Sequence, residues 1–251
     1  MEIKVSAGDI ARTEAGAIIV NFFEGMEHPE SDTATVDEAL GGAISQLISQ
    51  GEIKGKLREI TIIHSLGKLS AARVVVAGLG KREELSQDRV RGVVAETCRL
   101  LRQKGVDSIA TIAQGEGIAG ITAEGAAQAI IEGALLGVYS FRRHITKEPE
   151  YGEIKQLTIV DSDETKLPAL KQGCHKGRIL AEATNLARDM VNEPANYMTP
   201  SHMADMAAKL AETYGLELSV LEREQMQELG MGALLGVAQG SRQPPKFIVL
   251  H

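Results

Sequence analysis

The sequence predicts an α/β fold with a mixed sheet, followed by a long helix and the beginning of a second α/β unit. Three observations lead to this prediction. Short β-branched runs alternate with amphipathic stretches over roughly the first 160 residues. One helical pattern then extends from about Pro168 to Val191. A second series of short helical and strand patterns follows it and ends in the apolar run Phe247–Leu250.

The first elements are a strand, a helix and two further strands. Ala17–Val20 is a β-branched run typical of a buried strand, and Val36–Gln50 has its apolar residues on one helical face. Residues 59–64 and 73–77 form two strand patterns joined by the turn Leu66-Gly67-Lys68. The two strands are close enough in sequence for a hairpin, so we expect a mixed sheet.

The alternation continues to about residue 160. We expect a helix over 86–104, with Ser86 as its N-cap and Gly105 as its stop. Strands are expected at 108–113 and 156–160, with a helix over 122–143 between them. This order predicts helices on both faces of one sheet.

The acidic run Asp161–Glu164 precedes the long helix. It has neither the spacing, the glycine nor the closing glutamate of an EF-hand loop. We interpret it as acidic residues at the start of a helix, where the helix dipole favours them. The helix of about 24 residues would span about 36 Å, enough to bridge two domains, and Pro194 ends it.

The second unit has two helical patterns, a glycine-spaced segment and two strands. The helices are expected at 199–214 and 222–229, with a strand at 216–221 between them. Gly230–Gly240 is a glycine-spaced segment, and Phe247–Leu250 has the composition of a central strand. Because the printed sequence stops at His251, we expect this strand to lack partners and the second domain to be incomplete.

Composition disfavours several classes of protein. The formal charge is −7 and the pI about 5.5, and no basic block exceeds Arg142-Arg143, which argues against nucleic acid as a partner. The start of the chain has no signal-peptide pattern, and no apolar stretch is long enough to span a membrane. The only cysteines, Cys98 and Cys174, lie far apart. We therefore expect a cytoplasmic protein without a membrane partner.

Residues Gly115–Gly120 match the pattern G-x-G-x-x-G between a strand and a helix, where backbone N–H groups can bind a dinucleotide phosphate. The match is weak, because it follows a late strand and places Glu116 where the pyrophosphate would lie. The acidic residue after the next strand, Asp161, is about twice as far from the glycines in sequence as a ribose-binding acidic residue would be. The alternative interpretation is a surface turn.

No residue pattern identifies a catalytic centre. The histidines have no metal-binding helical spacing, the cysteines have no C-x-x-C partner, and no G-x-S-x-G elbow occurs. Asp189 and Glu193 are four residues apart, which we interpret as local electrostatics near a helix end. We therefore assign no catalytic, metal-binding or cofactor-binding residue in this chain.

Three blocks in order resemble the leucyl aminopeptidases of the cytosolic, two-metal type. They are A-R-D-M-V-N-E-P-A-N-Y-M-T-P at 187–200, E-L-G-M-G-A-L-L-G-V-A-Q-G-S at 228–241 and P-P-K-F-I-V-L at 244–250. The first 160 or so residues resemble the N-terminal α/β domain of that family, which is similar to the macro domain. The resemblance implies a macro-like domain at 1–165, a connecting helix at 166–192 and the start of a catalytic domain at 193–251. Within that start, it implies a packed turn at Gly230–Gly240.

The resemblance also implies an activity. Members of this family release N-terminal residues from peptides, as homo-hexamers, with two divalent ions (manganese, zinc or magnesium) that activate a water. Their metal ligands lie in G-K-G-x-x-x-D-S-G-G and N-T-D-A-E-G-R blocks, neither of which occurs in these 251 residues. We therefore expect this chain to bind no metal and to be inactive alone.

Two alternatives remain open. A macro-like domain could act as a nucleotide- or ADP-ribose-binding module, which the glycine-rich turns at Gly78–Gly80 and Gly115–Gly120 favour. A DNA-architectural role, known for some relatives, is opposed by the acidic balance.

Overall fold

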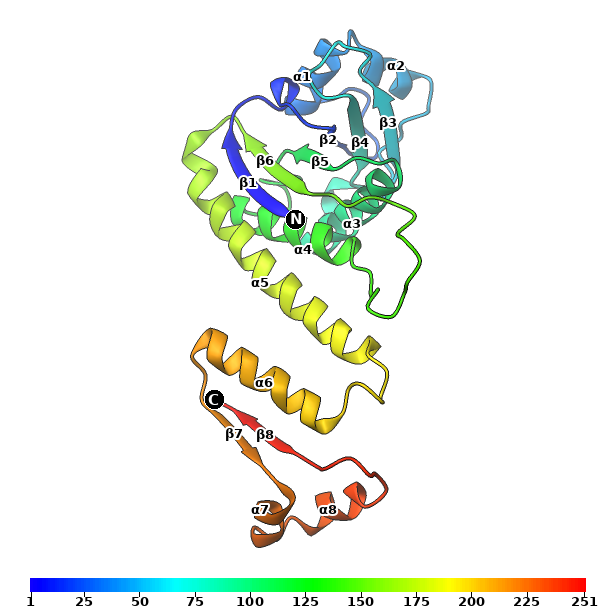
Figure 1. Cartoon of the computed structure of the whole chain (residues 1–251). Coiled ribbons are helices and arrows are strands. Elements are labelled where there is room, and N and C mark those ends of the chain that lie inside the picture. Colours follow the sequence, from blue (N-terminus) through cyan, green and yellow to red (C-terminus); the bar gives the residue numbers. More distant parts are fainter. The chain divides into compact units, whose positions relative to one another are not determined.

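The computed structural model describes residues 1–251, which divide into two units, Met1–Asn185 and Leu186–His251. The larger unit is built on a six-stranded sheet in the order β1-β6-β5-β2-β4-β3 (Figure 1). Its strands are β1 (Glu2–Ala7), β2 (Ala17–Phe22), β3 (Ile60–His64), β4 (Arg73–Gly78), β5 (Ser108–Thr111) and β6 (Gln156–Asp161). Neighbouring strands are parallel except for the antiparallel pair β3 and β4, so the predicted hairpin and mixed sheet are confirmed.

Helices cover both faces of this sheet. They are α1 (Ser31–Ala39), α2 (Ala43–Ser49), α3 (Gln87–Gln103), α4 (Ala123–Gly137) and α5 (Leu167–Asn192), with short 3₁₀ turns at Ile10–Arg12, Arg82–Glu84 and Glu164–Lys166. Residues of α1 and α2 pack with Ile18 and Val20 of β2, whereas α3, α4 and α5 pack against the face that carries Ile19. Because side chains alternate along a strand, one apolar run supplies both cores.

The helices α3, α4 and α5 touch through their backbones. A Cβ atom on Gly173 of α5 would lie 2.2 Å from the Glu124 carbonyl oxygen of α4, and one on Gly177 would lie 2.7 Å from that of Gln128. A Cβ atom on Gly133 of α4 would lie 2.5 Å from the Arg91 carbonyl oxygen of α3. Glycine at these positions therefore sets how closely the three helices approach.

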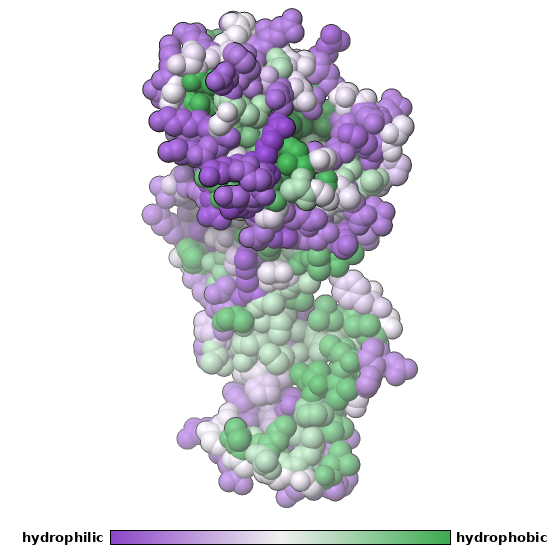
Figure 2. All heavy atoms as spheres, turned by 180° about the vertical axis from the view of Figure 1, so that it is seen from behind, coloured by the Kyte–Doolittle hydropathy of each residue, from purple (hydrophilic) through white to green (hydrophobic).

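The smaller unit contains the C-terminal end of α5, then α6 (Pro200–Tyr214), β7 (Leu218–Leu221), α7 (Arg223–Glu228), α8 (Gly232–Ala238) and β8 (Phe247–Leu250). Strands β7 and β8 form an antiparallel pair, and neither has a second neighbour. Several large apolar side chains are exposed, and Figure 2 shows apolar residues gathered over this unit. They are Val191, Tyr197, Met203, Tyr214, Leu216, Leu229, Val237 and Leu250.

The predicted N-cap Ser86 and the predicted start of a helix at Thr199 are confirmed. Ser86 accepts a hydrogen bond from the Arg89 N–H at the start of α3, and Thr199 accepts one from the His202 N–H at the start of α6. Gly215 ends α6 in the left-handed region. No helix in the structure combines the length and apolar character that a membrane span requires.

Four expectations were wrong. The helix expected over 36–50 is two helices, because the chain turns at Gly41 and Gly42, whose φ angles are +73° and +82°. The helix expected over 122–143 ends at Gly137. The segment 230–240 is not only a packed turn, since it contains α8, and β8 does have a ladder partner, β7. Sequence reasoning also missed β1, whose edge position leaves it only half apolar.

We expect Gly173→Ala to lower the free energy of unfolding by about 1–3 kcal/mol, because the added methyl group must push α5 away from α4. The measurement is urea unfolding followed by far-UV circular dichroism. Gly152→Ala is the matched control, since a Cβ atom there meets nothing within 4 Å. Equal stability of the two variants would contradict the assigned helix contact.

Candidate functional site

A cavity of about 380 Å³ lies at the carboxyl ends of β2, β5 and β6 in the larger unit. Three segments far apart in sequence line it: 21–32 after β2, 112–118 after β5 and 161–166 after β6, together with Arg82. In a parallel sheet these strand ends meet at one edge, so the topology brings the segments together.

At this cavity, the connections that follow two adjacent parallel strands leave to opposite faces of the sheet. From β2 it continues to α1 on one face of the sheet, whereas from the adjacent β5 it continues to α4 on the other face. Adjacent strands whose connections leave to opposite faces form a crevice outside their carboxyl ends. This is the usual position of ligand sites in open α/β sheets.

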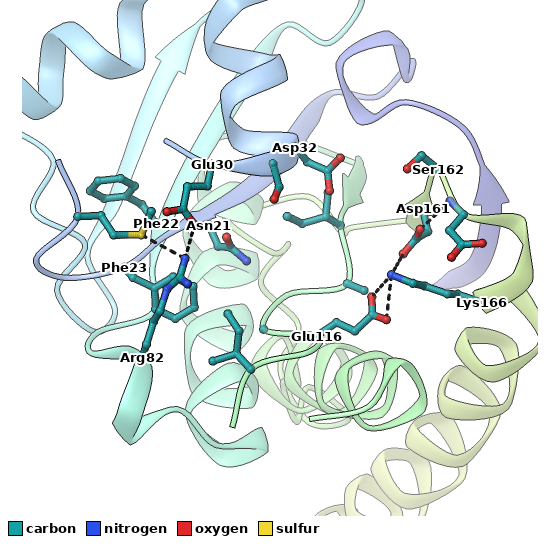
Figure 3. Close-up of a pocket in the computed structure, with 17 residues that line it drawn as sticks. Asn21, Phe22, Phe23, Glu30, Asp32, Arg82, Glu116, Asp161, Ser162 and Lys166 are labelled. Atoms are coloured by element: carbon teal, nitrogen blue, oxygen red, sulfur yellow. Dashed lines mark hydrogen bonds and ion pairs between the residues drawn. The ribbon is translucent and has the colours of Figure 1, made fainter. Parts of the chain in front are cut away.

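Lys166 forms one end of the site (Figure 3). Its Nζ lies 3.0 Å from Glu116 Oε1 and 3.9 Å from Asp161 Oδ2. The hydrogen bond to Glu116, with the nearby carboxylates, raises the pKa of Lys166 above its ordinary value despite partial burial. The ammonium group is therefore charged at neutral pH.

Arg82 forms the other end. Its Nη2 pairs with Glu30 Oε2 at 2.5 Å, and its guanidinium lies 5.0 Å from the centroid of the Phe23 ring. Met26 Sδ accepts a further contact from the same nitrogen at 3.6 Å. These partners hold Arg82 against the wall formed by the residues after β2.

Asp32 lies between these two groups and has no ion pair or hydrogen bond to its side chain (Figure 3). Partial burial raises the pKa of Asp32, and the charges of Asp161 and Asp9 raise it further. The lining contains five carboxylates, from Glu30, Asp32, Glu116, Asp161 and Asp163, against the two cations Arg82 and Lys166. The cavity therefore has a surplus of negative charge.

The glycine-rich turn contributes Gly115 and Glu116 to the lining. The N–H groups of Glu116, Gly117 and Ile118 all donate to carbonyl oxygens within the turn. They are thus not available to cradle a phosphate, and Glu116 points to Lys166. These backbone N–H groups are instead hydrogen-bonded within the turn, in agreement with the surface-turn interpretation.

The other candidate groups from the sequence are not brought together. No group of three or more His, Cys, Asp or Glu side chains is arranged to hold a metal ion. Cys98 and Cys174 are buried and unpaired, and burial raises their thiol pKa values to about 12 and about 11. In the acidic run, Asp163 accepts a hydrogen bond from the Thr165 N–H and caps the turn before α5, as expected.

Sequence reasoning missed Asp32, Arg82 and Lys166 as members of one site. A signal was present, because polar residues directly follow the strand runs that end near Val20 and Val160. The relative positions of those strands were not predictable from local patterns, so these residues gave no visible constellation.

Comparisons with known proteins place both units in one family. Residues 19–148 match the N-terminal domain of the cytosol aminopeptidase family, and residues 185–251 match the catalytic domain of that family. The chain is 37% identical over its whole length to a probable cytosol aminopeptidase of Alkaliphilus oremlandii, of which it covers 50%. It is 39% identical to one of Solibacter usitatus, of which it covers 48%.

Solved structures agree on the fold. A tomato leucine aminopeptidase mutant matches the whole chain with a TM-score of 0.82 at 22% identity, over 50% of that structure. The bottromycin maturation enzyme BotP in complex with Mn matches 94% of the chain with a TM-score of 0.74 at 26% identity, over 45% of that structure. The chain belongs to the cytosol aminopeptidase family, and it spans about half the length of the curated relatives that it matches.

We expect Asp32→Asn and Asp163→Asn to change stability in opposite directions. The raised pKa of Asp32 means that its charge destabilises the fold, so Asp32→Asn raises the melting temperature at neutral pH. This gain disappears as the pH falls below the raised pKa. The pKa of Asp163 is lowered by its hydrogen bonds with Thr165, so Asp163→Asn removes stability that is present at neutral pH and lost in acid.

Thermal unfolding of both variants and the parent chain between pH 3 and pH 8, followed by circular dichroism, measures these shifts. Changes of the same sign at pH 7 would show that the two carboxylates do not have the assigned environments.

Proposed function

We propose that the protein to which these residues belong is a metal-dependent leucyl aminopeptidase that releases N-terminal amino acids from peptides. The observation that carries the proposal is the order of the matches, an N-terminal domain followed by catalytic-domain sequence, with similarity along the whole chain. The motif blocks at 187–200, 228–241 and 244–250 support it.

Two divalent ions would supply an activated water and hold the substrate carbonyl during peptide hydrolysis. Manganese, zinc and magnesium are the candidates, and the relative BotP was solved with Mn. The described residues do not fit such a site, because no three suitable side chains converge. We therefore assign no ligand here and propose that the metal-binding blocks lie in sequence other than these 251 residues.

The smaller unit supports the proposal that the metal-binding blocks lie in sequence other than these 251 residues. Strand β8 pairs only with β7, and Val237 is 86% exposed. An isolated two-stranded sheet is only marginally stable, and exposed apolar side chains favour burial against a partner surface. We propose that further catalytic-domain sequence covers this unit, and that the complete enzyme is a cytoplasmic homo-hexamer acting on peptides.

We expect the purified 251-residue chain with manganese to show no hydrolysis of a chromogenic leucine amide above the rate without protein. The reason is the lack of a converging metal-ligand set. The positive control is a full-length relative, such as the Alkaliphilus oremlandii protein, assayed in the same buffer. Metal-dependent turnover by the 251-residue chain would refute the proposal that the metal-binding blocks lie in other sequence.

A nucleotide- or ADP-ribose-binding role is the second candidate. The position of the cavity at the reversal of the sheet topology favours it, as does a volume suited to a small ligand. The surplus of carboxylates and the internally bonded glycine turn oppose a diphosphate. The proposal of a macro-like N-terminal domain belongs to this second candidate.

Calorimetric titration with ADP-ribose tests the second candidate. If the cavity takes the nucleotide, heat is released, and Asp32→Asn tightens binding by about tenfold because one facing negative charge is removed. Lys104→Gln, an exposed change remote from the cavity lining, is the control and leaves the affinity unchanged. Absence of heat at millimolar ligand would remove the second candidate.

A further inference from the structure

The open edge of the large sheet is strand β1. It is the terminal strand of the sheet and pairs only with β6. The N–H groups of Glu2 and Gly8, at the two ends of this ladder, donate to Lys155 and Asp161 of the β6 side. Since successive backbone groups of a strand point in opposite directions, those of Ile3, Val5 and Ala7 point away from the sheet. These groups are available to another strand.

A groove of about 310 Å³ runs between this edge and helix α5, which lies beside β1 in Figure 1. Its apolar part is formed by Ile3 and Val5 of β1 and by Cys174 of α5. Its remaining lining residues, Lys171, His175 and Arg178, all come from α5. Their spacing of four and three residues places them on one face of the helix.

The groove is positively charged on a protein whose net charge is −7. None of the three basic side chains makes an ion pair or hydrogen bond, whereas the neighbouring Lys176 pairs with Glu124 at 3.7 Å. No carboxylate lines the groove. On β1, Lys4 pairs with Glu2, and both alternate with the groove-facing residues Ile3 and Val5. The unpaired ammonium group of Lys171 and guanidinium group of Arg178 therefore face the open edge without a compensating charge.

These features together favour one kind of binding partner. Outward-pointing backbone groups pair with an extended chain, the apolar floor takes an aliphatic side chain, and unpaired cations attract carboxylates. Nucleic acid fits less well, because three basic groups neutralise few phosphates and no aromatic side chain lines the groove for base stacking.

We propose that the groove between β1 and α5 binds an extended acidic peptide segment, which adds as a strand to β1 and places its carboxylates against Lys171 and Arg178. The proposal concerns a protein partner of the larger unit and does not depend on the peptidase activity. Successive side chains on one face of a strand are about 7 Å apart, so the preferred segment has acidic and aliphatic residues at alternate positions of that face.

The test uses the full 251-residue chain and a fluorescent peptide of sequence Glu-Thr-Val-Thr-Glu-Thr-Val-Thr-Glu. We expect binding by fluorescence anisotropy that weakens as salt is added, and loss of binding when every Glu of the peptide is replaced by Gln. In ¹⁵N spectra, the amides of Ile3, Val5 and Ala7 should become protected from hydrogen exchange when the peptide is bound. Equal binding of the Gln peptide would overturn the proposal.

Substitutions on the protein locate the contact. We expect K171Q with R178Q to weaken binding by about tenfold, as expected for the loss of two partly exposed charge contacts. The matched control, K56Q with K104Q, removes the same charge from exposed positions outside the groove and leaves binding unchanged. Circular dichroism establishes that all variants remain folded.

Ala7→Pro provides an independent variant, because it removes an outward N–H group and no basic side chain. It should weaken peptide binding, whereas unchanged binding would exclude strand addition at this end of β1. Two other outcomes would also overturn the proposal: self-association through the groove without peptide, and stronger binding of a short DNA duplex that displaces the peptide.

Discussion

The backbone contact between helices α4 and α5 is the constraint on which both sites of the larger unit depend. Gly173 and Gly177 allow α5 to lie against carbonyl oxygens of α4, closer than any other residue would permit. The 3₁₀ turn that leads into α5 brings Lys166 to the cavity at the strand ends. The next turns of the same helix place Lys171 and Arg178 beside the edge strand. A shift of α5 would therefore alter both surfaces.

Charge is distributed unevenly over this acidic molecule. The cavity collects carboxylates from segments after three different strands, and its two cations are already paired. The groove at the sheet edge has unpaired cations and no carboxylate. The net charge governs long-range attraction, but these local surpluses decide which ligand chemistry each surface can accept. The same fold therefore presents two surfaces with opposite preferences.

The two units differ in how well they bury their own apolar residues. In the larger unit, every strand of the sheet except the edges has apolar residues buried on both faces. In the smaller unit, the buried apolar side chains are Ala207, Ala211 and Met226, and large ones such as Leu229 and Val237 are exposed. The curated relatives in the cytosol aminopeptidase family are about twice as long as this chain. Their additional sequence can offer apolar surface against which side chains like those exposed in the smaller unit can be buried. The larger unit has its own core, whereas the smaller unit has surface suited to a partner.

Elements whose signals are local could be predicted from the amino-acid sequence alone. Apolar periodicity marked most helices and strands, Ser86 and Thr199 marked helix starts through a single hydrogen bond each, and the ordered motif blocks indicated the family. Which strand ends meet depends on the strand order of the folded sheet. Asp32, Arg82 and Lys166 follow β2, β4 and β6, and no local pattern encodes the order β6-β5-β2-β4 that brings those segments together. The edge position of β1 was hidden for the same reason, since an unpaired edge is a property of the whole sheet.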